Sequence, residues 1–174
     1  MRIRIGNGTL FRIASLLAHY PEVEVTEEEI REAERGLSVC EACLVSVLSR
    51  EMLFALEGEA PSRFFLFLRG CGHLSRLLPE LDCLPDEAFL GMDAVMLGRG
   101  ANPVLRFALL ASFLGRERTL SICRRLRLPR RHLRAALLAS RHGDLDFASV
   151  SRKRNGRKCL FWDPEERRTF PDRR

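Results

Sequence analysis

The stretch Pro61–Asp82, PSRFFLFLRGCGHLSRLLPELD, has the clearest structural pattern in the chain. Pro61 suits the first turn of a helix, whereas Gly70 and Gly72 favour its end. The apolar residues between them recur at positions i, i+1, i+3 and i+4, which is the spacing of one helix face. We therefore predict a short helix here whose phenylalanines, together with a later one, lie in a core: Phe64, Phe65, Phe67 and Phe107.

Helix start signals occur on both sides of this stretch. Thr26 and Glu29 match the capping box, in which a hydroxyl and a carboxylate three residues apart bond reciprocally to backbone N–H groups. Asn102 or Pro103 is expected to start another helix, which runs through Phe113. No alternating strand pattern is evident.

The remaining segments complete an all-helical interpretation. An apolar helix is expected over 38–57, and a final helix pair over 116–141 with a hinge at Pro129. We predict an all-α fold, a compact array of about seven to eight helices, for a domain over 1–143. Residues 144–174 are basic and poor in apolar residues, which predicts a partly disordered tail.

Composition limits the class of protein. The 174 residues suffice for one domain with a core, and 46% hydrophobic with 30% charged residues is typical of a globular protein. No apolar run approaches the roughly 18 residues that a membrane-spanning helix needs, and the N-terminus lacks a signal-peptide pattern. We expect a soluble, cytoplasmic protein with no contact to a membrane.

The six cysteines are expected to be reduced and mostly buried as small apolar residues. Cys40 and Cys43 have the spacing of zinc ligands, but a structural zinc site needs a second pair of cysteines or histidines. Neither is present at a suitable spacing, so we expect no metal and no cofactor.

Charge is unevenly distributed along the chain. The net charge is +6, yet residues 1–115 carry 11 basic against 16 acidic residues. Residues 116–134 carry eight arginines against Glu117 alone, and 151–174 carry nine basic against four acidic residues. A basic C-terminal third on an acidic body favours a polyanionic partner, although solvated helix faces rich in arginine would give the same composition.

Three stretches resemble bacterial tRNA nucleotidyltransferases and the related poly(A) polymerases. Pro61–Leu84 is similar to the PSRFF…LRE.G.L..LLPE-D hallmark of the helical RNA-binding region that follows the catalytic head. Cys123–His142 is similar to the family's C-x-RLR-x-P helix pair, and Gly8–Ile30 to the helix and turn just after the head. The resemblance covers about residues 8–142 and implies the helical C-terminal RNA-binding region alone, with tRNA as the expected partner.

The head's motifs are not expected in this chain. The family's glycine-serine pair and D-x-D have no sequence before Met1 to supply them, and Asp144–Asp146 fits the D-x-D letters without the flanking turn or strand. The templating motif E-D-x-x-R would fall on Ile5, Gly6 and Thr9, which lack the groups that select a base.

The phosphohydrolase segment of some relatives, RFAALLHDLGK, corresponds to RFALLASFLGR here. Ser112 and Phe113 then stand where a histidine and an aspartate would bind a metal, and phenylalanine offers no ligand. The four histidines are isolated from partners at triad or metal spacing. We expect that the chain is not an enzyme on its own.

Given this resemblance, arginines are the expected RNA contacts, because the planar guanidinium binds phosphate in a bidentate manner. We name the group around Pro129 the arginine corner, which comprises Arg124, Arg125, Arg127, Arg130, Arg131 and Arg134. Further candidates of second rank are Arg63, Arg69 and Arg76. With no aromatic residues for reading bases beside them, we expect recognition of A-form shape.

An alternative hypothesis is a protein-interaction subunit that completes a split nucleotidyltransferase, whose catalytic head is a separate chain. The first helix would then carry an apolar face that the head normally covers. Exposure of the following residues would favour this alternative: Leu10, Phe11, Leu17 and Tyr20.

Overall fold

The computed structural model describes residues 9–35, 41–97 and 100–141. This part of the chain contains ten helices, eight of which have at least eight residues, so the all-α prediction is confirmed. The expected tail and the first residues of the expected helix 38–57 lie outside the described residues.

The helices are α1 (Thr9–His19), α2 (Glu27–Arg35), α3 (Glu41–Ala55), α4 (Ser62–Gly70), α5 (His73–Leu77), α6 (Pro79–Asp82), α7 (Asp86–Asp93), α8 (Pro103–Ser112), α9 (Gly115–Arg125) and α10 (Arg130–Ala139). Two strands of two residues, β1 (Met96–Leu97) and β2 (Gly100–Ala101), pair antiparallel between α7 and α8.

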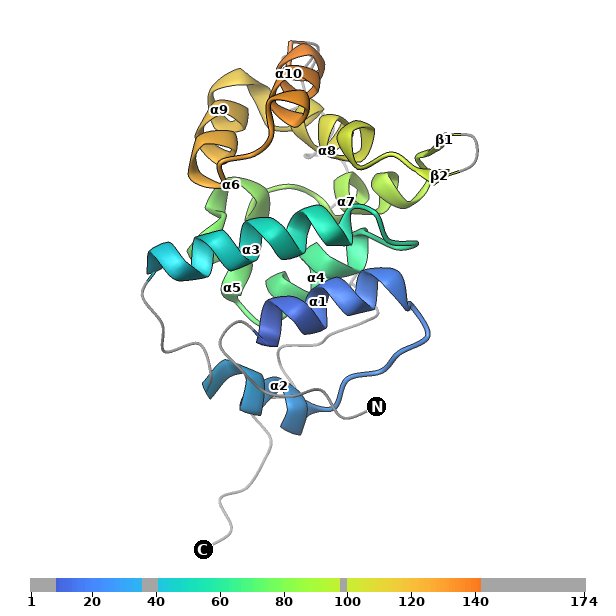
Figure 1. The fold of residues 1–174 in the computed structure, drawn as a ribbon, viewed down its shortest axis with the longest axis vertical. Helices are drawn as coiled ribbons and strands as arrows, with labels where there is room; N and C mark the ends of the chain where they lie inside the picture. Colours follow the sequence, from blue (N-terminus) through green and yellow to red (C-terminus); the bar gives the residue numbers. More distant parts are fainter. Residues whose placement is uncertain (1–8, 36–40, 98–99, 142–174) are drawn as a thin grey trace, which may run out of the picture.

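The helices are arranged along the long axis of the molecule, with α2 towards one end and α9 and α10 at the other (Figure 1). Helix α1 packs against α3 and α4, and α8 packs against α10. None of the helices in the described ranges is long and apolar enough to cross a bilayer. Buried side chains from both ends form one core, whose largest apolar members include Phe11, Leu48, Met52, Phe64, Phe65, Phe89 and Phe107.

Helix α4 begins at Ser62, directly after Pro61, and is held by α7. The backbone N–H of Ser62 donates to Asp93 at 2.9 Å, and the Ser62 hydroxyl donates to the other oxygen of that carboxylate. Phe65 stacks on Phe89 of α7 with ring centroids 5.2 Å apart, and Phe64 meets Phe65 edge to face. The core prediction is confirmed for the buried Phe64, Phe65 and Phe107 and for the half-buried Phe67.

The Thr26–Glu29 capping box that the sequence predicts is present, and α8 begins where the sequence places a helix start. The Thr26 N–H donates to Glu29 Oε2 at 2.9 Å, and the Glu29 N–H donates to Thr26 Oγ1 at 3.4 Å, which is the reciprocal pattern of a capping box. The hydrogen bonds from Thr26 lower the pKa of the Glu29 carboxyl. Asn102 accepts hydrogen bonds from the N–H groups of Val104 and Leu105, so it caps α8.

A buried arginine connects α8 to the turn between α3 and α4. Arg106 is fully buried and donates from Nη1 to the carbonyl oxygens of Leu56, at 2.9 Å, and Gly58. Burial lowers the pKa of Arg106 and nearby Asp93 raises it, yet an arginine guanidinium stays charged in proteins. Gly58 itself lies against α1, because a Cβ atom there would be 2.4 Å from the Ala18 carbonyl oxygen.

Candidate nucleic-acid interface

The turn between α9 and α10 determines where the side chains of the arginine corner lie. Helix α9 ends at Arg125, and the next residue but one, Arg127, has a left-handed backbone with φ of 49°. The N–H of Leu128 donates to the Cys123 carbonyl at 3.0 Å, which is the six-to-one hydrogen bond of a Schellman motif. Pro129 then precedes α10, so the chain reverses direction within a few residues.

All six side chains of the arginine corner are exposed. Within the described ranges, no side-chain hydrogen bond or ion pair is formed by five of them: Arg124, Arg127, Arg130, Arg131 and Arg134. On α10, Arg134 lies three and four positions after the other two arginines, so these side chains share one side of the helix. The arrangement concentrates cationic charge that the described part of the chain does not neutralise.

The start of α10 is an unfavourable place for cations. The N-terminus of a helix carries a partial positive charge, so acidic residues are normally preferred in the first turn. Arg130 and Arg131 occupy that turn of α10, no acidic residue is present there, and no side chain caps the helix. An anion bound at this end would relieve the repulsion.

Arg125 has a different role from its neighbours. It forms an ion pair with Glu80 at 2.9 Å and donates to the Leu77 carbonyl oxygen at 2.9 Å. Glu80 also accepts a hydrogen bond from the Ser121 hydroxyl at 2.8 Å. These contacts attach α9 to α5 and α6, and they bring the exposed Arg76, which precedes Leu77, close to the arginine corner.

The structure places Arg69 inside a junction of three helices. Its guanidinium pairs with Asp86, donates to the carbonyl oxygens of Leu81, Asp82 and Leu84, and lies 4.7 Å from the ring centroid of Phe89. Arg69 therefore fixes the connection between α6 and α7. Arg63, on the same helix, is half-buried.

The strained backbone of Arg127 yields a prediction that separates stability from binding. Glycine is the usual residue at this position of a Schellman motif, because the left-handed region costs an L-residue about 1–2 kcal/mol. We expect Arg127→Gly to leave stability unchanged or to raise it by up to about 1 kcal/mol, after the entropy cost of glycine. For the RNA contact that the sequence analysis predicts at this residue, the same substitution should lower the affinity about tenfold or more, since one charge-assisted contact contributes about 1.5–3 kcal/mol.

Arg124→Gly is the matched control for this experiment. It removes an arginine from the same corner, but in the last turn of α9, where glycine costs about 1 kcal/mol. Urea denaturation should therefore show a lower free energy of unfolding for Arg124→Gly but not for Arg127→Gly. Equal destabilisation by the two substitutions would contradict the strain at Arg127.

The positions corresponding to the phosphohydrolase motif do not form a metal site. The Ser112 hydroxyl donates to the Leu109 carbonyl of its own helix at 2.6 Å, and Phe113 is half-buried against the core. Among the described residues, no group of three or more histidine, cysteine, aspartate or glutamate side chains is placed to hold a metal ion. Cys40 and Cys43, whose spacing alone resembles that of zinc ligands, and the Asp144–Asp146 segment lie outside the side chains that the structure describes.

The described histidines are separated and serve packing. His132 is buried with no hydrogen-bond partner for either ring nitrogen, and its ring lies edge to face with Phe107 at 6.3 Å. Burial and the neighbouring Arg131 lower the pKa of His132. His73 lies 3.6 Å from Glu34 of α2, and burial lowers its pKa despite that carboxylate.

The three cysteines with described side chains are free. Cys123 is buried, as expected, and burial raises the pKa of its thiol to about 11. Cys83 is exposed at the end of α6 and lies 3.3 Å from the Arg118 guanidinium, so it is an exception to the expectation that most of the cysteines are buried. Cys71 is half-buried.

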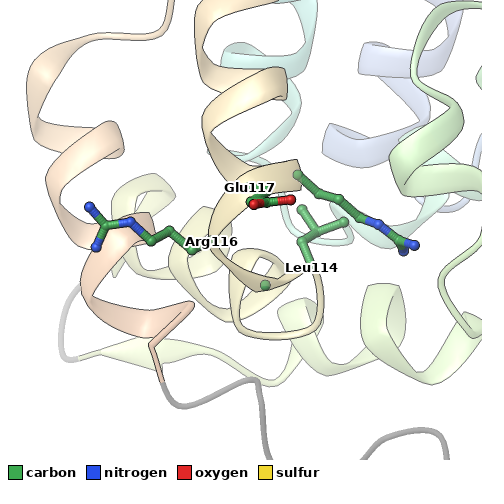
Figure 2. A pocket seen from close by; sticks show the side chains of 5 residues that line it. Leu114, Arg116 and Glu117 are labelled. Carbon is green, nitrogen blue, oxygen red and sulfur yellow. The ribbon is translucent and has the colours of Figure 1, made fainter.

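A shallow hollow of about 440 Å³ lies where α8 meets α9, lined by residues 114–118. Figure 2 shows that Arg116 extends away from Leu114 and Glu117. The polar groups therefore do not converge on a common point, as they would in a small-molecule site. The hollow adds no chemistry to the arginine corner.

Together these features define an all-helical domain with an exposed cationic surface at one end. The chain is 27% identical over 145 residues to a CCA-adding enzyme of Coxiella burnetii, covering 82% of this chain and 38% of that protein. It is 28% identical over 172 residues to a multifunctional CCA protein of Burkholderia cenocepacia, covering 78% of this chain and 42% of that protein. The multifunctional CCA protein of Burkholderia lata is similar to the same extent.

This similarity supports a relationship to the tRNA nucleotidyltransferase family. The chain spans about two fifths of the length of these relatives. No protein-family profile matches the chain. A comparison with solved structures also finds no match.

Proposed function

We propose that this domain binds RNA, and tRNA in particular, through the arginine corner, without catalysing nucleotide addition itself. The observation that carries the proposal is the set of five exposed arginines that have no partner among the described residues. Their position around an uncapped helix start adds to the attraction for a phosphate. The similarity to CCA-adding enzymes makes tRNA the natural polyanion to test.

Recognition would depend on shape and charge. The phenylalanines of α4 and α8 are in the core, and the described part of the corner is arginine with aliphatic residues, so bases have no ring there to stack on. Arginine forks bind phosphates on the wide, shallow side of an A-form helix without reading its sequence. Arg76 would extend the contact surface beyond the α9–α10 turn, whereas Arg69, Arg125 and the half-buried Arg63 would support it from within.

The alternative of a subunit that completes a split nucleotidyltransferase receives less support. Leu10, Phe11 and Leu17 are buried against the rest of the domain, so the first helix presents no open apolar face. Only Tyr20 of the four indicator residues is exposed. A separate head protein would need a different docking surface.

The test is a titration of labelled tRNA with the purified chain at several salt concentrations. We expect micromolar affinity near physiological salt and a steep loss as salt rises, because each neutralised phosphate releases counterions. A duplex RNA of unrelated sequence should compete nearly as well as tRNA. Binding that is independent of salt would contradict the proposal, and nucleotide addition to tRNA in the presence of CTP and ATP would contradict its non-catalytic part.

A further inference from the structure

A second surface, of opposite charge, lies at the end of α1. We name the exposed residues Tyr20, Val23 and Phe54, together with the half-buried His19, the aromatic patch. The His19 ring stacks on Phe54 with centroids 4.0 Å apart, and its Nε2–H donates to the Phe54 carbonyl at 2.8 Å. Tyr20 is 53% exposed, Phe54 43% and Val23 41%, so large apolar side chains of α3 and of the segment that follows α1 are open to solvent.

The aromatic patch is bordered by carboxylates. The Ala60 N–H donates to the Ala18 carbonyl at 2.8 Å, so the turn after α3 lies beside the end of α1. This places the exposed Glu57 and Glu59 near the same surface as the exposed residues Glu22 and Glu24, which flank Val23. The segment 20–34 carries seven glutamates against Arg31 alone, and that arginine is paired with Glu27.

The nearest cation on α3 does not offset the negative charge around the aromatic patch. Arg50, one turn before Phe54, forms an ion pair with Glu51 at 3.0 Å. An exposed apolar surface surrounded by like charges marks an interaction site for a partner of the opposite charge. RNA would be repelled here, so the partner must combine cations with apolar or aromatic side chains.

This chain contains a segment of that chemistry. Residues 152–162, RKRNGRKCLFW, carry five cations and no acidic residue, and they end in Leu160, Phe161 and Trp162. We propose that this segment, which lies outside the described residues, docks on the aromatic patch of its own chain. Its arginines and lysines would pair with the surrounding glutamates, while Phe161 and Trp162 would pack against Tyr20 and Phe54.

The connection is long enough for docking within one molecule. Arg106 of α8 donates to the Gly58 carbonyl oxygen and α8 packs against α10, so only one helix separates α10 from the turn that borders the aromatic patch. Residue 141 lies nine positions beyond His132, about 13 Å along a helix. The next eleven residues span up to about 36 Å when extended. A tether of this length supplies a millimolar effective concentration, which compensates for weak individual contacts.

Trp162 makes the proposal testable in the intact chain, because it is the single tryptophan. We expect its fluorescence at low salt to be blue-shifted and protected from acrylamide, compared with a free tryptophan amide. Phe54→Ser should shift the emission to the red and restore quenching. Replacing Glu22 and Glu24 by lysine should do the same without removing an apolar contact, which guards against a folding defect in the first variant.

Leu90→Ser is the matched control, because Leu90 is an exposed apolar residue of similar exposure, 51%, on α7. It should leave the emission of Trp162 unchanged. Three results would overturn the proposal: free quenching of Trp162 in the wild-type chain, an unchanged emission in both patch variants, or protection that grows with protein concentration, which would indicate docking between two chains.

The same experiment distinguishes docking from RNA binding by the segment. A Trp162 that is unprotected alone and changes only when RNA is added would assign residues 152–162 to RNA and overturn the proposal. Substituting the arginine corner should not affect the protection of Trp162. Failure of the proposed RNA-binding function and failure of this docking are therefore seen in separate measurements.

Discussion

Simultaneous reversal of Arg124, Arg127 and Arg131 to glutamate is expected to weaken tRNA binding by at least about a hundredfold. Each charge-assisted hydrogen bond contributes about 1.5–3 kcal/mol, and reversal adds repulsion from the same phosphates. The three side chains are exposed and have no described partner, so their loss breaks no contact of the fold. The helical circular dichroism spectrum should therefore be unchanged.

The salt dependence of the remaining binding adds a second readout. Each phosphate contact contributes close to one unit to the slope of log affinity against log salt, so removal of three should reduce that slope by about two to three. A shift in affinity with the slope preserved would place the phosphate contacts elsewhere.

A control with the same charge change tests whether position matters. Arg12 of α1 and Arg31 and Arg35 of α2 are exposed at a distance from the α9–α10 turn, and their reversal to glutamate changes the net charge equally. We expect a loss of only a fewfold through the long-range field, which salt screens over about 8–10 Å. Equal loss in both triple variants would mean that net charge, and not the arginine corner, determines binding.

The parts of this fold that the sequence predicts are those with local causes. The Thr26–Glu29 capping box and the helix start at Asn102 depend on residues within three positions of each other, and both form. The helical spacing of Phe64 and Phe65 predicts one buried face whatever the partner is. What spacing alone omits is that Phe89, 24 positions after Phe65, supplies the stacking ring.

The roles of individual arginines depend on distant partners and were not predictable in this way. Arg125 and Arg124 are neighbours in the sequence, yet Arg125 pairs with Glu80, 45 positions earlier, while Arg124 faces solvent. Arg69 resembles a surface cation until α6 and α7 place carbonyl groups and Asp86 around it. One signal was present: acidic residues cluster at 80–87, and an acidic segment near a basic helix favours internal pairing.

The aromatic patch is not predicted by the sequence. Tyr20 is named there only as an indicator of a face covered by a separate head, and its exposure here results from the path of two segments. Gly58 allows the turn after α3 to approach the Ala18 carbonyl closely, and this contact places Phe54 beside His19. A glycine that is required for close approach cannot be distinguished from an ordinary turn glycine without the neighbouring helix.

Arg106 is the residue whose loss should cost most stability. Arg106→Met keeps much of the side-chain volume but leaves the carbonyl oxygens of Leu56 and Gly58 without their donor, and Asp93 without its nearby positive charge. Removing one member of a buried charged network typically costs about 3–5 kcal/mol, because the remaining polar groups stay desolvated. We expect the free energy of unfolding, measured in urea, to fall by that amount.

Arg12→Met provides the matched control, since it makes the same substitution at an exposed arginine of α1 and should change stability by less than about 0.5 kcal/mol. Under conditions where Arg106→Met remains folded, its tRNA affinity should equal that of the wild type, because Arg106 is buried and cannot reach a phosphate. A stable Arg106→Met protein would show that water enters to satisfy the two carbonyl groups. Loss of tRNA binding from the folded variant would instead show that the turn between α3 and α4 helps to position the arginine corner. Helix α3 already contacts the α9–α10 turn, because the Ser49 hydroxyl donates to the Leu126 carbonyl oxygen at 2.7 Å.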